Sequence, residues 1–441
     1  MTVLDLPLDL QRLRHRSAVS WLRRAVYRAM VGSDGWPPTF RALAPGEPAP
    51  TGASPHLYVH LPFCARLCPH CPYTRQLFRP ERARAYGEAL RRELEAYLRR
   101  PGLPPVRSLY FGGGTPSLTP ELVELGIDLL RPLFAPGAEV GVEVHPSDAA
   151  PAFLGRLRAG GVTRVSLGVE SLRADLLKTL GRGYAPEEAL EAIRAARRAG
   201  FECVDVNLIF GIPGQNPAEA SADVERCLGL GVDQVSAYPL FTFAHTPLGR
   251  LVAEGRFPSY GDRSRLRAQR LVSEACRRYG LARTSVWSFT RPGVAPYSTV
   301  TREDYVGFGA GAGSKVGGEF WFNTFSVDAY VASAVPRPAL RFQASERLRR
   351  AHWLYWQVYR TEVDPVRYRE LFGRDLERDF AVPLAALVAC GMAGRTEGRW
   401  RLTERGAIWV HRLQAVFSLA WIDELWSRGL SEPWPAEVVL S

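Results

Sequence analysis

Residues 57–74 read LYVHLPFCARLCPHCPYT, a short apolar run that leads into three cysteines, Cys64, Cys68 and Cys71. Disulfides are rare in the cytosol, so a tight cysteine group there indicates metal binding or catalysis. Thiolates are the usual ligands of iron–sulfur clusters, and three ligands for four irons would leave one iron open to a further molecule. A structural zinc loop is the alternative, because His60 or His70 could supply the fourth ligand that zinc requires.

Outward from this loop, short apolar runs alternate with amphipathic helical segments. The predicted strands are 57–61, 108–111, 139–144, 164–168, 203–209 and 234–238. The predicted helices between them are 82–98, 120–133, 149–159, 186–199 and 217–228. Strands that alternate with helices form a parallel sheet with right-handed crossovers, and six such units are too few for the usual eight-stranded barrel. We therefore expect an α/β fold built as a partial (β/α)6 barrel, with an active site at the carboxyl ends of its strands.

Further motifs follow the cysteines along the chain. They are YFGGGTPS (110–117), EVHP (143–146), GVES (168–171), LGR (180–182), NLIFGIPGQ (207–215) and YVGFGAGA (305–312). Together with YVHLPFC (58–64), they closely resemble the radical S-adenosylmethionine (SAM) domain of the oxygen-independent coproporphyrinogen III oxidase family, the HemN-like proteins. The resemblance runs from about residue 57 to about residue 430.

The resemblance implies a [4Fe–4S] cluster on Cys64, Cys68 and Cys71, with SAM bound at the open iron. A reduced cluster of this kind passes one electron to SAM, which breaks into methionine and a 5′-deoxyadenosyl radical that abstracts hydrogen from an unactivated C–H bond. The resemblance also implies a set of residues that contact SAM. These residues are Gly112, Gly113, Gly114, Thr115, Glu143, Glu170, Arg182, Asn207 and Ile209.

Several of the implied SAM contacts also have a plainer interpretation. The three glycines could form a tight strand–helix turn, because glycine lets the backbone approach closely. Arg182 could bind the SAM carboxylate through its planar guanidinium group, or it could join a surface ion pair. Glu170 and Asn207 stand where the family more often carries Gln and Asp, and both can still bond ribose hydroxyls. Ile209 could flank adenine or belong to the core.

The reaction that follows hydrogen abstraction depends on residues outside the cysteine triplet. Tyr73 stands two positions after Cys71, where the porphyrinogen decarboxylases of the family carry a further cysteine, so this residue argues against decarboxylation. Tyr58, Tyr297 and Ser298 fall near family positions that contact a second SAM. We therefore expect these three residues to be catalytic in methyl or methylene transfer to a small molecule with two SAM molecules, as in the family's class C methyltransferase and cyclopropanase branch.

Three alternatives remain open. One is oxygen-independent coproporphyrinogen oxidation or other tetrapyrrole chemistry, for which Arg302 and Lys315 could receive an anionic substrate. The second is a haem chaperone with the same fold, whose iron ligand could be His145 or His245. The third is nucleic-acid binding by a C-terminal winged module. Its helices mix Arg, Glu and Trp, so we expect this module to pack against the barrel instead.

Changes in pattern divide the chain into four expected parts. These are an N-terminal extension and linker (1–55), the radical SAM partial barrel (56–260), a barrel extension with substrate or second-SAM loops (261–338) and a small C-terminal accessory domain that is winged-helix-like (339–441).

The net charge is +11, and lysine occurs only at positions 178 and 315. The arginines alternate with acidic residues, as in 81–100, which is typical of solvated helical faces rather than of a nucleic-acid-binding patch. No run of about eighteen apolar residues occurs, and residues 1–12 lack the apolar core of a secretory signal. We expect a cytoplasmic protein with a small-molecule substrate, a reductant such as flavodoxin or ferredoxin, and neither a membrane nor a nucleic acid as partner.

Overall fold

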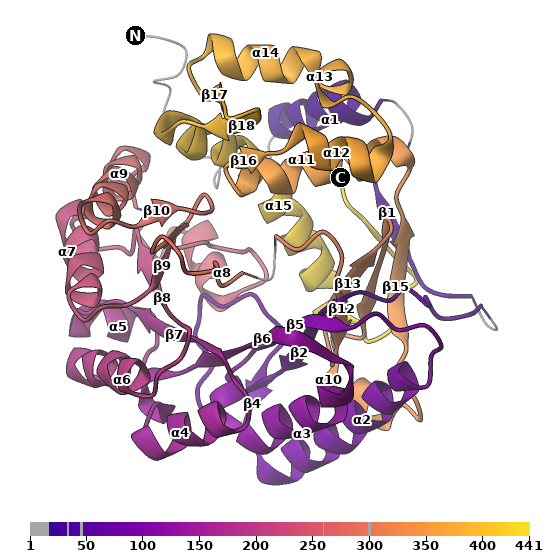
Figure 1. The fold of residues 1–441 in the computed structure, drawn as a ribbon, viewed down its shortest axis with the longest axis vertical. Coiled ribbons are helices and arrows are strands. Elements are labelled where there is room, and N and C mark those ends of the chain that lie inside the picture. Colours follow the sequence, from indigo (N-terminus) through magenta and orange to yellow (C-terminus); the bar gives the residue numbers. More distant parts are fainter. Residues whose placement is uncertain (1–16, 33–34, 45–46, 259, 299–300) are drawn as a thin grey trace.

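The fold is given by a computed structural model that describes residues 17–32, 35–44, 47–258, 260–298 and 301–441. Within these residues, the main sheet has nine strands in the order β10-β11-β9-β8-β7-β6-β5-β2-β12. Its six central strands are parallel to one another: β2 (His56–Leu61), β5 (Val106–Gly113), β6 (Phe134–Val144), β7 (Arg164–Glu170), β8 (Cys203–Phe210) and β9 (Gln234–Pro239). The six predicted strands and the expected partial α/β barrel are confirmed (Figure 1).

Helices connect successive strands and cover the outside of this sheet (Figure 1). They are α2 (Pro80–Leu98), α3 (Pro120–Leu130), α4 (Pro151–Ala159), α6 (Pro186–Arg198) and α7 (Pro217–Leu228), together with the short α5 (Ala174–Thr179), which the sequence pattern did not predict. The five predicted helices begin with proline. Its fixed φ suits the first helical turn, and its missing N–H is not needed there. These crossovers place the carboxyl ends of the parallel strands on one rim.

Further strands extend the main sheet at both edges. β12 (Val306–Phe308) pairs in parallel with β2, so the YVGFGAGA motif lies beside the strand that leads to the cysteines. At the other edge, β11 (Ser288–Thr290) pairs antiparallel with β9, and β10 (Ala282–Arg283) pairs with β11. The helix α9 (Asp262–Arg278) precedes β10 and packs against α7.

A second sheet brings together segments from the two ends of the chain. Its strands, in order, are β13 (Gly313–Val316), β14 (Glu319–Asn323), β15 (Pro338–Gln343), β1 (Thr39–Arg41) and β19 (Glu437–Val439). β1 lies in the predicted N-terminal extension, yet it pairs with both β15 and β19. That part of the extension is therefore built into the C-terminal half of the molecule, while the four domain boundaries remain predictions.

The rest of the C-terminal half is a helical unit that lies above the barrel in Figure 1. Its elements are α11 (Glu346–Tyr359), β16 (Glu362–Val363), α12 (Pro365–Phe372), α13 (Leu376–Asp379), α14 (Ala381–Ala389), β17 (Ala393–Thr396), β18 (Arg399–Leu402) and α15 (Glu404–Ser431). Helices, a hairpin and a long helix follow in the winged-helix-like order that the sequence predicts. α1 (Ser17–Val31) packs into the same core through Tyr27. None of the described helices combines the length and apolar character that crossing a membrane would need.

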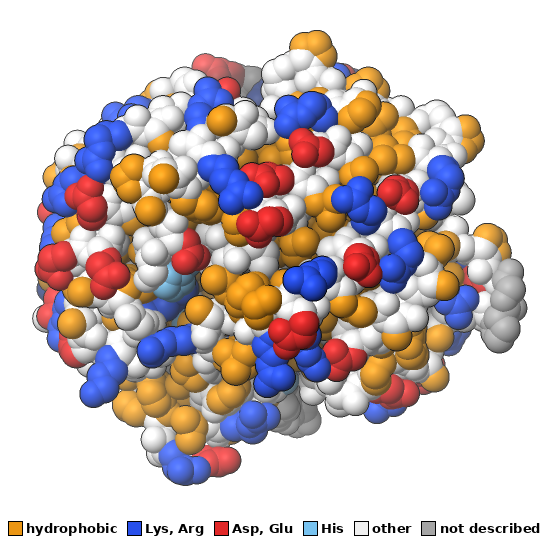
Figure 2. Space-filling view, turned by 90° about the horizontal axis from the view of Figure 1, so that it is seen from below, with side chains coloured by type: hydrophobic (Ala, Val, Ile, Leu, Met, Phe, Trp, Pro, Cys, Tyr) orange, Lys and Arg blue, Asp and Glu red, His pale blue; other side chains and the backbone are white. Residues whose placement is uncertain are grey.

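Charges of both signs share the molecular surface. On the face seen in Figure 2, basic and acidic side chains are interspersed rather than gathered into one patch. Many surface arginines pair with neighbouring acids, for example Arg156 with Glu124 at 2.6 Å and Arg198 with Glu191 at 2.6 Å. This arrangement agrees with the expectation of solvated helical faces.

Glu93 of α2 links the barrel to the YVGFGAGA loop, and its substitution tests that link. Its carboxylate accepts hydrogen bonds from Gly309 N at 2.8 Å, Asn323 Nδ2 at 2.7 Å and Tyr330 Oη at 2.6 Å. All three partners donate, so Glu93→Gln would turn an N–H group toward one of them. Because an unpaired donor costs about 1–3 kcal/mol, we expect urea titration to show a loss of that size in the free energy of unfolding.

The exposed Glu88 of the same helix provides the control. Glu88→Gln should change the free energy of unfolding by no more than about 0.5 kcal/mol. Equal losses in the two variants would contradict the role of Glu93.

Candidate active site

The three cysteines lie in one loop whose base is closed by a short strand pair. β3 (Phe63–Cys64) pairs with β4 (Gln76–Leu77), and inside the loop Cys71 N donates to Cys68 O at 3.3 Å. All three cysteines are free thiols. Burial raises the pKa of Cys64 to about 11, and it also raises the pKa of Cys71. Their thiolates therefore form when a metal displaces the protons, as in protein metal sites generally.

Arg75 holds this loop, although the sequence analysis did not single it out. Its guanidinium donates to the carbonyl oxygen of Cys68 at 2.5 Å and to that of Cys71. The charge of Arg75 lowers the pKa of Cys64 and Cys71, in opposition to burial. In the described part of the chain, no group of three or more His, Cys, Asp and Glu side chains surrounds a single ion site. A four-iron cluster does not require its ligands to surround one ion, because each cysteine binds a different iron.

The glycines at the end of β5 pack against the start of the cysteine loop. A Cβ atom at Gly114 would lie 2.7 Å from the Phe63 carbonyl oxygen. At Gly113, where φ is +115°, a Cβ atom would lie 2.7 Å from the His60 ring. Glycine is therefore required here by close packing, as the tight-turn interpretation expects. SAM binding by Gly112, Gly113, Gly114 and Thr115 remains a prediction.

Glu170 and Arg182 form a buried ion pair at the carboxyl end of β7. Arg182 Nη2 donates to Glu170 Oε1, and the two side chains are 16% and 6% exposed. Glu170 Oε2 and Arg182 Nε have no hydrogen-bond partner among the described residues. Buried charges need their remaining bonds satisfied. A ligand such as SAM, which carries a carboxylate together with an ammonium and hydroxyl groups, would supply both missing partners.

Glu143 and Asn207 are bound to polar side chains of neighbouring strands. Tyr110 Oη donates to Glu143 Oε1 at 2.7 Å, and burial raises the pKa of Glu143 to about 7. Asn207 Nδ2 donates to Ser166 Oγ at 2.7 Å, and Ser166 in turn donates to the buried Asp205 at 2.6 Å. Both predicted contacts therefore lie in polar networks.

The structure brings several of the predicted SAM contacts close to the cysteine loop or to one another. A Cβ atom at Gly112 would lie 3.1 Å from Glu143 Oε1, and one at Gly181 would lie 2.8 Å from Pro69 Cδ. Arg182 therefore follows a residue that touches the cysteine loop. Ile209 instead lies in a separate apolar cluster, which favours its interpretation as core. That cluster also contains Leu176, Leu180, Ile212, Leu240 and Leu248.

Tyr297 packs its ring against Tyr110, which in turn packs against Tyr58. Its ring centroid lies 4.9 Å from that of Tyr110, which lies 6.0 Å from that of Tyr58. Gly141 makes room for it, because a Cβ atom there would lie 2.6 Å from the Tyr297 ring. Gln234 fixes the Tyr297 backbone: its Oε1 accepts from Tyr297 N at 2.8 Å, and its Nε2 donates to Tyr297 O at 2.9 Å. Tyr58 of β2, Tyr110 of β5 and the loop residue Tyr297 thus form a tyrosine row.

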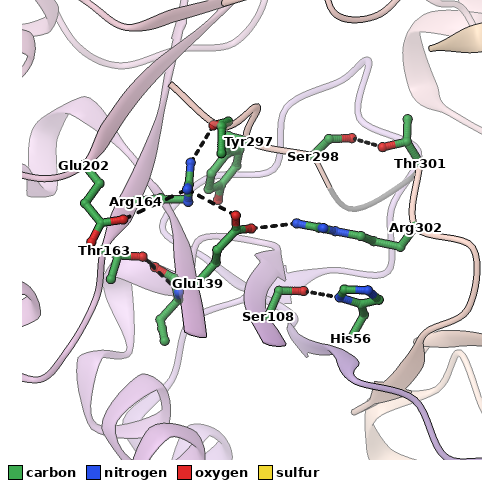
Figure 3. Close-up of polar contacts among 12 residues, drawn as sticks. His56, Ser108, Glu139, Thr163, Arg164, Glu202, Tyr297, Ser298, Thr301 and Arg302 are labelled. Carbon is green, nitrogen blue, oxygen red and sulfur yellow. Dashed lines mark hydrogen bonds and ion pairs between the residues drawn. The ribbon is translucent and has the colours of Figure 1, made fainter. Parts of the chain in front are cut away.

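The loop that carries Tyr297 also holds Ser298 and Arg302 (Figure 3). The hydroxyl groups of Ser298 and Thr301 lie 3.0 Å apart, so Ser298 points along its own loop. Arg302 donates to Glu139 at 2.7 Å, and the buried amine of Lys315 donates to the Arg302 carbonyl oxygen at 3.3 Å. The two cations considered for an anionic substrate therefore already bind protein groups.

Two of the histidines considered as metal ligands use both ring nitrogens within the protein. His60 Nε2 lies 2.8 Å from Thr74 O, and its Nδ1 lies 2.9 Å from Tyr58 Oη. A carbonyl only accepts, so Nε2 donates and Nδ1 accepts from Tyr58. His245 contacts the Pro72 carbonyl and the Asp423 carboxylate. In this conformation, neither ring has a nitrogen left for zinc or haem iron.

Comparison with known proteins gives this geometry a context. Residues 58–227 match the family described as the Radical SAM superfamily. The heme chaperone HemW of Bacillus subtilis is 26% identical over 363 residues, which cover 80% of this chain and 96% of the relative. The oxygen-independent coproporphyrinogen III oxidase of Pseudomonas aeruginosa is 30% identical over 384 residues, 78% of this chain and 82% of the relative. The structure of coproporphyrinogen III oxidase (HemN) from Escherichia coli superposes on this chain with a TM-score of 0.71 at 21% sequence identity. The match covers 90% of this chain and 98% of the HemN chain, which shows a shared fold.

The Glu170–Arg182 pair predicts unequal contributions of its two members to SAM binding. Arg182→Gln removes the cation, and hydrogen bonds to charged groups contribute about 1.5–3 kcal/mol, so we expect the Kd for SAM to rise about 10-fold or more. Glu170→Gln keeps an oxygen that can accept a hydrogen bond from SAM and leaves Arg182 in place, so we expect a smaller rise in the Kd for SAM. Anaerobic calorimetric titration measures both, with Arg173→Gln, which removes a half-exposed arginine paired with Asp175, as control. Weaker binding in Glu170→Gln than in Arg182→Gln would contradict this assignment.

The contacts of Gln234 predict that it stabilises the tyrosine row. Gln234→Leu leaves the backbone N–H and C=O of Tyr297 without their buried partners, so we expect a loss of about 1–3 kcal/mol in the free energy of unfolding. Ser298→Ala on the same loop removes one contact with Thr301 and should cost no more than about 0.5 kcal/mol. Urea denaturation of both variants is the measurement, and a larger loss in Ser298→Ala would show that the loop is held differently.

Proposed function

This chain belongs to the radical SAM superfamily, in the branch of the HemW and HemN-like proteins, and we propose that it uses SAM cleavage to act on a tetrapyrrole at the mouth of its barrel. The cofactors of the superfamily are a [4Fe–4S] cluster and SAM. When bound, they supply a radical that abstracts hydrogen from a C–H bond. The observation that carries the proposal is the cysteine loop beside Glu170 and Arg182, whose buried polar atoms lack partners.

The residues around this loop would bind and orient the cofactors. Cys64, Cys68 and Cys71 would hold the cluster, while Arg75 keeps the loop carbonyls in place. Arg182 would bind the carboxylate of SAM, and Glu170 would accept from its ammonium or ribose hydroxyls. A one-electron reductant completes the reaction, and we propose a flavodoxin or a ferredoxin for that part.

The polar residues deeper in the barrel would hold the rest of SAM. Glu143 and Asn207 would contact the ribose, because both lie in polar networks of neighbouring strands. The tyrosine row would close the space behind them and exclude water from the reacting atoms.

The named relatives favour a tetrapyrrole over the methyl acceptor expected from the sequence. Those compared above are named for haem or for coproporphyrinogen, and none for methyl transfer or cyclopropanation. A second SAM at Tyr58, Tyr297 and Ser298 is retained as a separate proposal. It would require these side chains to leave their present contacts with His60, Tyr110 and Thr301.

A haem chaperone is the second candidate, and Tyr73 favours it. Tyr73 stands where decarboxylases of the family carry a further cysteine, and its side chain is exposed. The HemW relative, moreover, is matched over 96% of its length. A chaperone of this kind would bind haem without forming a product, which separates it from the enzyme in a single assay.

The test is anaerobic incubation of the reconstituted, reduced protein with SAM, followed by mass spectrometry. Coproporphyrinogen and haem are added in parallel samples. We expect 5′-deoxyadenosine, formed faster when a tetrapyrrole is present. Tight haem binding without 5′-deoxyadenosine would replace the enzyme by the chaperone. S-adenosylhomocysteine together with a methylated product would overturn the tetrapyrrole proposal in favour of methyl transfer.

The cysteine assignment has its own expected outcome in the same assay. Cys64→Ala, Cys68→Ala and Cys71→Ala should each abolish the iron–sulfur chromophore and the formation of 5′-deoxyadenosine, because three ligands are needed to hold the cluster. Cys276→Ala changes a buried cysteine of α9 and should leave the chromophore unchanged. Unchanged iron content in all three loop variants would contradict the assignment of these cysteines as cluster ligands.

A further inference from the structure

The long C-terminal helix α15 reaches the cysteine loop through one histidine. His245 lies between β9 and α8 (Pro247–Ala253), and its Nε2 is 3.2 Å from the carbonyl oxygen of Pro72. Its Nδ1 is 2.7 Å from Oδ1 of Asp423, which belongs to α15. The backbone N–H of His245 donates to the same oxygen at 3.1 Å. A continuous chain of hydrogen bonds therefore joins α15 to the peptide that follows Cys71.

The direction of these hydrogen bonds is fixed by their acceptors. The Pro72 carbonyl can only accept, so Nε2 of His245 carries a hydrogen. Nδ1 then shares a second hydrogen with the carboxyl group of Asp423. The two side chains are 7% and 13% exposed. Hydrogen bonds in such surroundings are strong when made and costly to leave unmade.

The same segment supports the cysteine loop at a second point. Leu248 N donates to the carbonyl oxygen of Pro69 at 2.9 Å. Arg75 binds the carbonyl oxygens of Cys68 and Cys71. Pro72 is thus one of several loop residues whose carbonyl oxygens receive a donor, and its donor is the one backed by α15.

Other contacts dock α15 onto the barrel without touching the loop. Glu404 accepts from Arg283 and Ser273 at 2.7 Å and 2.6 Å. Arg412 donates to Asp262 of α9 at 3.0 Å. Docking of the helix and support of the loop can therefore be separated by mutation.

We propose that His245 and Asp423 are positioning residues through which α15 holds the cluster loop in its binding conformation. Hydrogen bonds just outside the metal ligands orient those ligands. Hydrogen bonding and solvent exposure also set the reduction potential of iron–sulfur clusters. Without His245, the Pro72 peptide loses its partner, so the position of Cys71 is less constrained. The inference rests on the proposed function only for the presence of the cluster. It does not depend on the identity of the substrate.

The test uses the full-length, reconstituted protein under anaerobic conditions. His245→Leu removes both ring nitrogens, whereas His245→Gln keeps a donor for the Pro72 carbonyl. We expect His245→Leu to release iron to a chelator about 10-fold faster or more, the usual scale for loss of an outer-shell partner. A redox titration followed by electron paramagnetic resonance should also show a shifted cluster potential. His245→Gln should restore both properties close to the wild type, and Asp423→Asn should lie between.

Arg412→Gln is the matched control, because it weakens the docking of α15 elsewhere. It should lower the melting temperature as His245→Leu does, without changing iron release or potential. Equal iron release in Arg412→Gln and His245→Leu, or wild-type behaviour of His245→Leu, would overturn the inference. A wild-type protein that assembles no cluster would instead overturn the proposed function.

Discussion

The buried carbonyl oxygens of the cysteine loop need hydrogen-bond donors, and other parts of the structure supply them. Several of its carbonyl oxygens receive no donor from the loop backbone, and buried carbonyls left without donors are costly. Donors come instead from Arg75 at the loop's end, from Leu248 of α8 and from His245, which Asp423 backs. The barrel rim, the segment after β9 and the C-terminal helix are therefore all required to hold one short loop.

The sequence predicted the barrel because its signals are local. Apolar runs alternate with amphipathic segments that begin with proline, and both patterns are readable within about a dozen residues. The second sheet gave no such signal, because β1 is only three residues long and its partners lie hundreds of positions away. Asp423 was missed for the same reason, since 178 positions separate it from His245. Arg75 was also missed, although it lies only four positions after Cys71.

The family resemblance pointed to Glu170 and Arg182, and the fold joins the two side chains in a buried ion pair. Their contact with SAM remains a prediction. Spacing could not reveal which way a loop residue points. Tyr297, which is expected to contact a second SAM, packs against Tyr110 with its backbone held by Gln234. The glycines of β5 show a related ambiguity, because close packing against Phe63 requires glycine there whether or not a ligand follows. Composition and pattern identify residue types in such cases, and only the fold assigns their partners.

The pairing of β1 with β19 has a consequence for the order in which the protein is made. Every parallel strand of the barrel leaves the ribosome before Asp423 and residues 437–439 are synthesised. During translation, the cysteine loop therefore lacks the support of α15, and the second sheet lacks its outer strand. Iron inserted at that stage would meet a loop with a free Pro72 carbonyl. The geometry thus favours cofactor assembly after translation, when α15 has already docked onto the cysteine loop.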